Sequence, residues 1–182
     1  RRSGSPRPGQ RPLSDHTQEL PGGLAVLAAP AGAEQTRQVL AELAAGGWEL
    51  LWSAARQDGR TVIVDCGRLD PASPVAPVLA VADVLLVVVR ARDDELAHLA
   101  ARLPVVQGWE IPAWYVVLAG QPRRIQDYRV RDVERVLGPH VLGPLPYDPA
   151  AAGVLEGRRR VRSGITRSRF GRATADLARY LT

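Results

Sequence analysis

Asp65 lies at a position in the sequence where a carboxylate could help to bind a metal ion. It follows the apolar run Val62–Val64 and precedes Cys66 and Gly67. A run that is apolar at every position is typical of a strand buried on both faces of a parallel sheet. Such a strand would hold its terminal acid rigidly, where the carboxylate could bind a magnesium-bound water. The acid could equally cap the next turn, and the pattern alone leaves both interpretations open.

The second candidate is a cluster of arginines near the carboxyl end. Its members are Arg158, Arg159, Arg160, Arg162, Arg167 and Arg169. Such a patch could bind the phosphates of DNA or of anionic lipid. It could also be an ordinary solvated surface. The chain contains no Lys, Asn or Met and all 24 basic residues are arginine, so runs of arginine arise easily from this composition alone. We favour the solvated surface. Because these residues include no lysine, none is available to form a Schiff base or to contact phosphate.

Charge is distributed unevenly along the chain. Residues 1–12 carry a net charge of +4 and residues 156–182 carry +6, whereas residues 13–155 hold 12 arginines against 17 acids, a net charge of −5. An acidic central region is not typical of a nucleic-acid-binding domain, although an arginine-rich end could add nonspecific affinity for phosphate.

Composition excludes several classes of protein. The chain has 182 residues, of which 46% are hydrophobic and 24% charged, as expected for one globular domain or slightly more. It shows no apolar run long enough to span a membrane and no secretory leader, so we expect a cytoplasmic protein. A single cysteine with three histidines excludes an internal disulfide and argues against a structural zinc site. The lack of an initiator Met suggests a fragment or a processed product.

Apolar runs alternating with helical patterns would position these side chains. The expected strands are 24–29, 61–65, 84–89, 113–119 and 141–145, and the expected helices are 34–45, 48–55, 93–103, 129–137, 149–155 and 166–181, with a short helical piece ending near Val81. This order predicts an α/β domain over residues 18–182, a doubly wound, mostly parallel sheet with helices on both faces. Residues 1–17 are expected to form a flexible arm. Ligands of such folds bind at the carboxyl ends of the strands.

The order of these pieces resembles the MinD/ParA family of deviant-Walker ATPases, and within it the TadZ/CpaE-like branch found with pilus assembly systems. The matching pieces are 22–27 with 29–30, 62–67, 82–90, 116–120, 141–148 and the closing helix to Leu181. The resemblance covers residues 18–182 and implies a P-loop NTPase-like fold. It also implies that Asp65 is the Walker B acid that holds Mg²⁺ through water, that Gly67 lies near the γ-phosphate, and that Pro146, Tyr147 and Asp148 lie beside the base of ATP.

The chain departs from the family pattern at two places. The family's glycine-rich loop with lysines has no counterpart here, since the turn 30–36 holds one glycine, no lysine and an acid, Glu34. Ala119 and Gly120 replace the asparagine that often reads the base. We therefore expect either that the phosphate loop lies upstream of Arg1, or that the chain is a degenerate relative that does not hydrolyse ATP.

The resemblance implies a function as well as a fold. It suggests a cytoplasmic protein, peripheral at a membrane or cell pole, that positions or partitions a chromosome, a septum or a pilus or secretion machine by nucleotide-dependent homodimerisation. Two alternatives stay open: a catalytically inactive scaffold that binds protein partners through its sheet edge or its arginine-rich end, and a partition factor that binds DNA nonspecifically.

Overall fold

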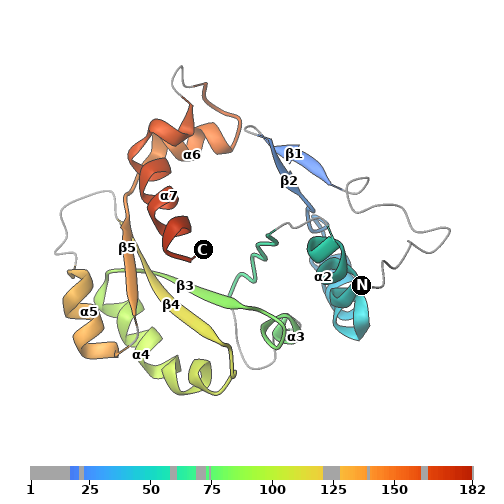
Figure 1. Cartoon of the computed structure of the whole chain (residues 1–182), viewed down its shortest axis with the longest axis horizontal. Coiled ribbons are helices and arrows are strands. Elements are labelled where there is room, and N and C mark those ends of the chain that lie inside the picture. The colour runs from blue at the N-terminus through green and yellow to red at the C-terminus, as the bar shows by residue number, and fades with distance from the viewer. Residues whose placement is uncertain are drawn as a thin grey trace. The chain divides into compact units, whose positions relative to one another are not determined.

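The computed structural model describes residues 17–20, 23–57, 61–68, 73, 75–120, 128–138, 140–160 and 164–181. The chain divides into two compact units, Arg1–Val75 and Ala76–Thr182 (Figure 1). The residues expected to form an arm, 1–17, lie outside the described residues apart from Thr17.

The first unit begins with a hairpin. Strand β1 (Gln18–Leu20) pairs antiparallel with β2 (Leu24–Val26), and Gly23, with a φ of 82°, makes the turn between them. The strand predicted at 24–29 is therefore shorter, and it belongs to a two-stranded sheet, not to the parallel sheet. Its partner β1 is a short, exposed segment without an apolar pattern, which is why the pairing was not predicted.

Two helices follow the hairpin. Helix α1 (Ala33–Glu42) continues through a π-helical turn, η2 (Leu43–Gly47), into α2 (Trp48–Gln57). The helix axis kinks at Gly46, whose φ of 128° is unfavourable for any other residue type. The predicted helices 34–45 and 48–55 and the break between them are confirmed.

The segment expected to be a buried strand, 61–65, is not a strand. Residues 61–67 lack regular secondary structure, and the side chain of Ile63 is 89% exposed. A strand forms only when neighbouring strands bond its backbone groups. No strand in the described part of the chain pairs with this segment, so its apolar composition alone does not make it a strand.

The second unit is built on a parallel sheet of three strands. They are β3 (Val84–Arg90), β4 (Ala113–Ala119) and β5 (Val141–Leu145), in the order β3-β4-β5. Val87 lies opposite Val116, which in turn lies opposite Val141. Helices α4 (Asp93–Gln107) and α5 (Val130–Leu137) connect them. All three strands and both connecting helices confirm the predicted elements, and α4 runs four residues further than expected.

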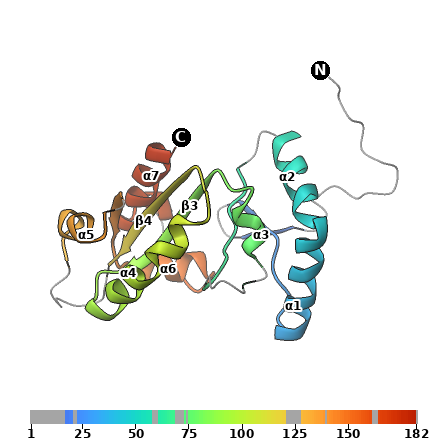
Figure 2. The ribbon, with the colours of Figure 1, turned by 90° about the horizontal axis from the view of Figure 1, so that it is seen from below.

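Helices cover both faces of this sheet. Val116 and Leu118 pack in one core with Leu99 of α4 and Val133 of α5. Successive side chains of a strand point to opposite faces, so Tyr115 faces the other side. There its ring contacts Tyr180 of helix α7 (Arg169–Leu181) edge-on, with ring centres 5.6 Å apart. Figure 2 shows α4 and α7 on opposite sides of the sheet. The predicted α/β class, a parallel sheet between helices, is confirmed.

The remaining elements are short. They are α3 (Ala76–Leu79), α6 (Pro149–Leu155) and the 3₁₀ turn η3 (Ile165–Arg167). The helix predicted at 166–181 therefore begins three residues later, at Arg169. Across the described ranges, no helix combines the length and apolar character needed to cross a membrane.

Candidate functional site

The three parallel strands all end on the same side of the sheet. There the loops after β4 and β5 are connected by a backbone hydrogen bond. The Gly120 N–H donates a hydrogen bond of 2.7 Å to the carbonyl oxygen of Leu145. A Cβ at position 120 would lie 2.9 Å from that oxygen and 2.9 Å from the Tyr147 nitrogen. Real Cβ atoms do not approach backbone so closely, so the absence of a side chain at Gly120 allows the two loops to meet.

The loop 146–148 leads directly into α6. The Asp148 Oδ1 atom accepts a hydrogen bond of 3.0 Å from the Ala151 N–H and caps the helix, which Pro149 begins. The Tyr147 side chain is 53% exposed beside this cap. The structure thus gives Asp148 a local role in holding the loop, while the tyrosine ring is accessible from solvent.

The loop after β3 is held by ionic contacts of its own. The Glu95 Oε2 atom accepts a hydrogen bond of 2.9 Å from the backbone N–H of Arg90. The Glu95 Oε1 atom pairs with the Arg90 guanidinium. This hydrogen bonding lowers the pKa of Glu95. Asp94 pairs with Arg92 at 3.0 Å. An acid five residues after the arginine that ends β3 is the sequence signal for this clamp.

Asp93, the third acid of this run, contacts a different residue. It accepts a hydrogen bond from the hydroxyl of Tyr128, which raises the pKa of that tyrosine. Within the described residues, no group of three or more His, Cys, Asp or Glu side chains could hold a metal ion. The acids after β3 therefore organise the loop and the start of α4.

Asp65 lies in the first unit, in an exposed turn. Its Oδ1 atom accepts a hydrogen bond of 2.9 Å from the Gly67 N–H, and Gly67 has a φ of 57°. This is the turn-capping geometry that the sequence left open. Partial burial, with the charge of Asp65, raises the pKa of the Cys66 thiol, so a smaller fraction of it is the nucleophilic thiolate than in a solvent-exposed cysteine.

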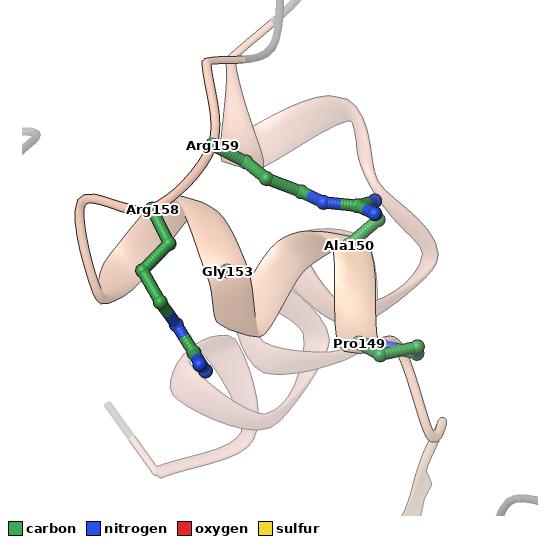
Figure 3. A pocket seen from close by; sticks show the side chains of 5 residues that line it. All are labelled: Pro149, Ala150, Gly153, Arg158 and Arg159. Atoms are coloured by element: carbon green, nitrogen blue, oxygen red, sulfur yellow. The ribbon is translucent and has the colours of Figure 1, made fainter.

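The arginine cluster begins at a pocket on α6. This pocket, of about 350 Å³, is lined by Pro149, Ala150, Gly153, Arg158 and Arg159. The stem of Arg159 crosses the helix at Gly153, where a Cβ would lie 3.2 Å from the arginine Cδ atom. Figure 3 shows the guanidinium of Arg159 beside Ala150, whereas Arg158 extends to the other side of the helix. Arg158 pairs with Glu156.

The other described members of the cluster do not line this pocket. Arg160, Arg167 and Arg169 are exposed, and Arg162 lies outside the described residues. The structure therefore brings Arg158 and Arg159 together with α6. Asp65 and Gly67 belong to the other unit.

The described residues fit a nucleotide only in part. The joined loops at 119–120 and 146–148 offer backbone groups and an accessible aromatic ring, as a base requires. The phosphates and Mg²⁺ would need a loop of backbone N–H groups, a cation and oxygen ligands. In the turn 30–36 the Thr36 hydroxyl already donates to the Pro30 carbonyl at 2.7 Å, and the chain has no lysine. These residues do not form a phosphate site.

Comparison with solved structures shows which known fold the chain has. No protein-family model matches the sequence. No curated protein matches it either. Among solved structures, the chain is similar to a ParA family ATPase from Chlorobium tepidum, with 20% identity and a TM-score of 0.69 over 93% of this chain and 69% of that one. It is also similar to the cell division ATPase MinD from Pyrococcus furiosus, with 19% identity and a TM-score of 0.67 over 95% of this chain and 71% of that one. The chain thus has the α/β, P-loop NTPase-like fold of these two ATPases.

Proposed function

We propose that this chain acts as a ParA/MinD-type protein, of the TadZ/CpaE-like kind, that positions or partitions a chromosome, a septum or a pilus or secretion machine by nucleotide-dependent dimerisation. The observation that supports this most is the pair of joined loops at the carboxyl edge of a parallel sheet, in a fold shared with ParA and MinD ATPases. Open α/β sheets bind their ligands at this edge. The proposal assigns the protein to the cytoplasm, peripheral at a membrane or pole.

In this proposal Pro146, Tyr147 and Asp148 line the base of ATP. The exposed Tyr147 ring offers an apolar face, and the Asp148 cap fixes the loop that carries it. Asp65 would hold Mg²⁺ through water and Gly67 would approach the γ-phosphate. Because the 182 residues include no lysine, the lysine-bearing phosphate loop of the resembled family would have to be supplied from outside them.

Thermal unfolding with and without Mg·ATP and Mg·ADP tests nucleotide binding. A ligand that binds only the folded state stabilises it by about 2.7 kcal/mol at a hundredfold excess over Kd. We expect nucleotide to raise the Tm, and we expect Tyr147→Ala to reduce this rise. The control is Tyr180→Ala, the same change at another exposed tyrosine, which should leave the rise unchanged. No shift at millimolar nucleotide would contradict the proposal.

A catalytically inactive scaffold is the second candidate. The absence of lysine and the unpaired edge of β3 among the described strands favour it. Phosphate release separates the two: an ATPase releases phosphate in the presence of Mg·ATP, and the release depends on Asp65. A scaffold gives neither phosphate release nor a nucleotide-dependent thermal shift.

Nonspecific DNA binding is a weaker alternative, favoured by the arginine pocket on α6. It predicts retention of duplex DNA that falls steeply as salt rises. Arg159→Ala should reduce this retention on every sequence equally. The matched control is Arg56→Ala, because Arg56 is an exposed arginine of the first unit. Retention that is insensitive to salt would contradict this alternative.

A further inference from the structure

Arg90 lies at the same end of the parallel sheet as the loops that would hold the base of ATP. It ends β3 and lies opposite Ala119 of β4, the residue before Gly120. Gly120 in turn bonds to Leu145 at the end of β5. Neighbouring strands are about 4.8 Å apart, so the backbone of Arg90 lies about 10 Å from the end of β5, across β4. Open α/β sheets bind their ligands at this edge.

The ion pair of Arg90 combines a backbone contact with a side-chain contact. The Glu95 Oε2 atom accepts a hydrogen bond of 2.9 Å from the Arg90 N–H, and the Oε1 atom pairs with the guanidinium. The backbone contact does not depend on the arginine side chain, so Glu95 would keep its place if the guanidinium moved. Glu95 also lies in the first turn of α4, where the helix dipole stabilises a negative charge. The guanidinium can therefore leave without displacing the acid.

The contact between the guanidinium and the carboxylate is weak enough to be exchanged. The Arg90 side chain is 57% exposed and that of Glu95 is 25% exposed. Ion pairs near solvent contribute little to stability. Arginine binds phosphate through two parallel N–H···O bonds, and such charge-assisted bonds are stronger than neutral ones. A phosphate bound at this edge could replace Glu95 as the partner of Arg90.

We propose that Arg90 binds a phosphate group of the nucleotide and that Glu95 competes with this phosphate for the guanidinium. The inference rests on the proposed function, because it takes the carboxyl edge of the sheet to be the nucleotide site. It adds a cation from β3 to the loops after β4 and β5. Glu95 is then a positioning residue: it holds Arg90 in the free protein and lowers nucleotide affinity because the phosphate must displace it.

Isothermal titration calorimetry of the whole chain with Mg·ATP and with adenosine tests this inference. Adenosine carries the base without phosphates. Arg90→Ala should raise the Kd of Mg·ATP about tenfold, equivalent to about 1.4 kcal/mol, and should leave the Kd of adenosine unchanged. Glu95→Gln keeps an acceptor for the Arg90 N–H and removes the competing charge. It should therefore lower the Kd of Mg·ATP about two- to threefold.

A double-mutant cycle separates this competition from a general effect of charge. Removing a negative charge would by itself favour an anion whether or not Arg90 is present. If Glu95 acts through Arg90, Glu95→Gln gives no gain in affinity once Arg90 is replaced by alanine. The matched control is Arg135→Ala, because Arg135 forms a similar exposed ion pair, with Asp132 at 2.8 Å, on the helix that leads into the start of β5. It should leave both Kd values unchanged.

The directions of the two changes distinguish competition from a purely structural ion pair. A structural pair predicts that Arg90→Ala and Glu95→Gln both weaken binding. Losses in both variants, or a gain from Glu95→Gln that persists in the Arg90→Ala background, would overturn the inference. Binding of Mg·ATP that Arg90→Ala does not change would also overturn it and would leave the proposed function standing. If neither Mg·ATP nor adenosine binds the wild-type chain, the proposed function fails and the inference fails with it.

Discussion

Replacing Gly120 with alanine should destabilise the fold by forcing apart the loops after β4 and β5. The new Cβ would lie 2.9 Å from the Leu145 carbonyl oxygen and 2.9 Å from the Tyr147 nitrogen. Both neighbours are backbone atoms, which cannot swing away as the end of a flexible side chain can. Overpacking of this kind costs about 1–3 kcal/mol, and the 2.7 Å hydrogen bond from the Gly120 N–H would be strained as well. We therefore expect a loss of about 2–3 kcal/mol.

Urea or thermal unfolding measures this loss. For a chain of this size 1 kcal/mol corresponds to about 2–4 °C in Tm, so Gly120→Ala should lower Tm by about 4–12 °C. Gly108→Ala is the control, because a Cβ there meets its nearest neighbour, the Val105 carbonyl oxygen, at 3.4 Å. A Gly120→Ala variant as stable as the Gly108→Ala variant would refute the argument that these loops are in close backbone contact.

Substitutions at three further positions test the packing, the helix cap and the ion pair of the second unit. Leu118→Ala removes a side chain that is 1% exposed in the core and should cost about 2–5 kcal/mol in urea unfolding; a loss below about 1 kcal/mol would contradict the packing. Asp148→Ala removes the cap on the Ala151 N–H and should cost about 1 kcal/mol, whereas Asp148→Asn should retain most of it. The folded-state pKa of Glu95 is lowered by Arg90, so its contribution is present above its unfolded pKa and is lost as pH falls through the lower folded value. Glu95→Gln should therefore be less stable than wild type at neutral pH, and the difference should shrink on acidification below about pH 4.5; an unchanged difference would contradict the clamp.

The parallel strands and their helices could be predicted because their determinants are close in sequence. Residues 84–89 and 113–119 are strands joined by α4, so each apolar run has its partner in the same β–α–β unit. The run 61–65 has equal apolar character but no partner strand among the described residues, and it is not a strand. Apolar composition thus indicates a capacity for burial, while pairing decides whether a strand forms.

In the candidate site too, local contacts could be predicted from the sequence, whereas contacts between distant segments could not. The Asp65 cap on the Gly67 N–H spans two residues and was one of the two interpretations that the sequence allowed. The approach of Gly120 to Tyr147 joins loops that are far apart in the chain, and only the three-dimensional register of β4 and β5 shows it. Likewise, the position of Arg159 over Gly153 depends on the turn after α6, which a count of arginines does not show.

Amide hydrogen exchange during titration with Mg·ATP tests most directly whether the carboxyl edge of the sheet binds nucleotide. The proposed function predicts added protection at Tyr147, saturating with nucleotide concentration. Little change is expected at Leu118, which lies in the paired strand, or at the Gly120 amide, which already bonds to Leu145. Saturable protection confined to other parts of the chain, or no change at any amide, would contradict it.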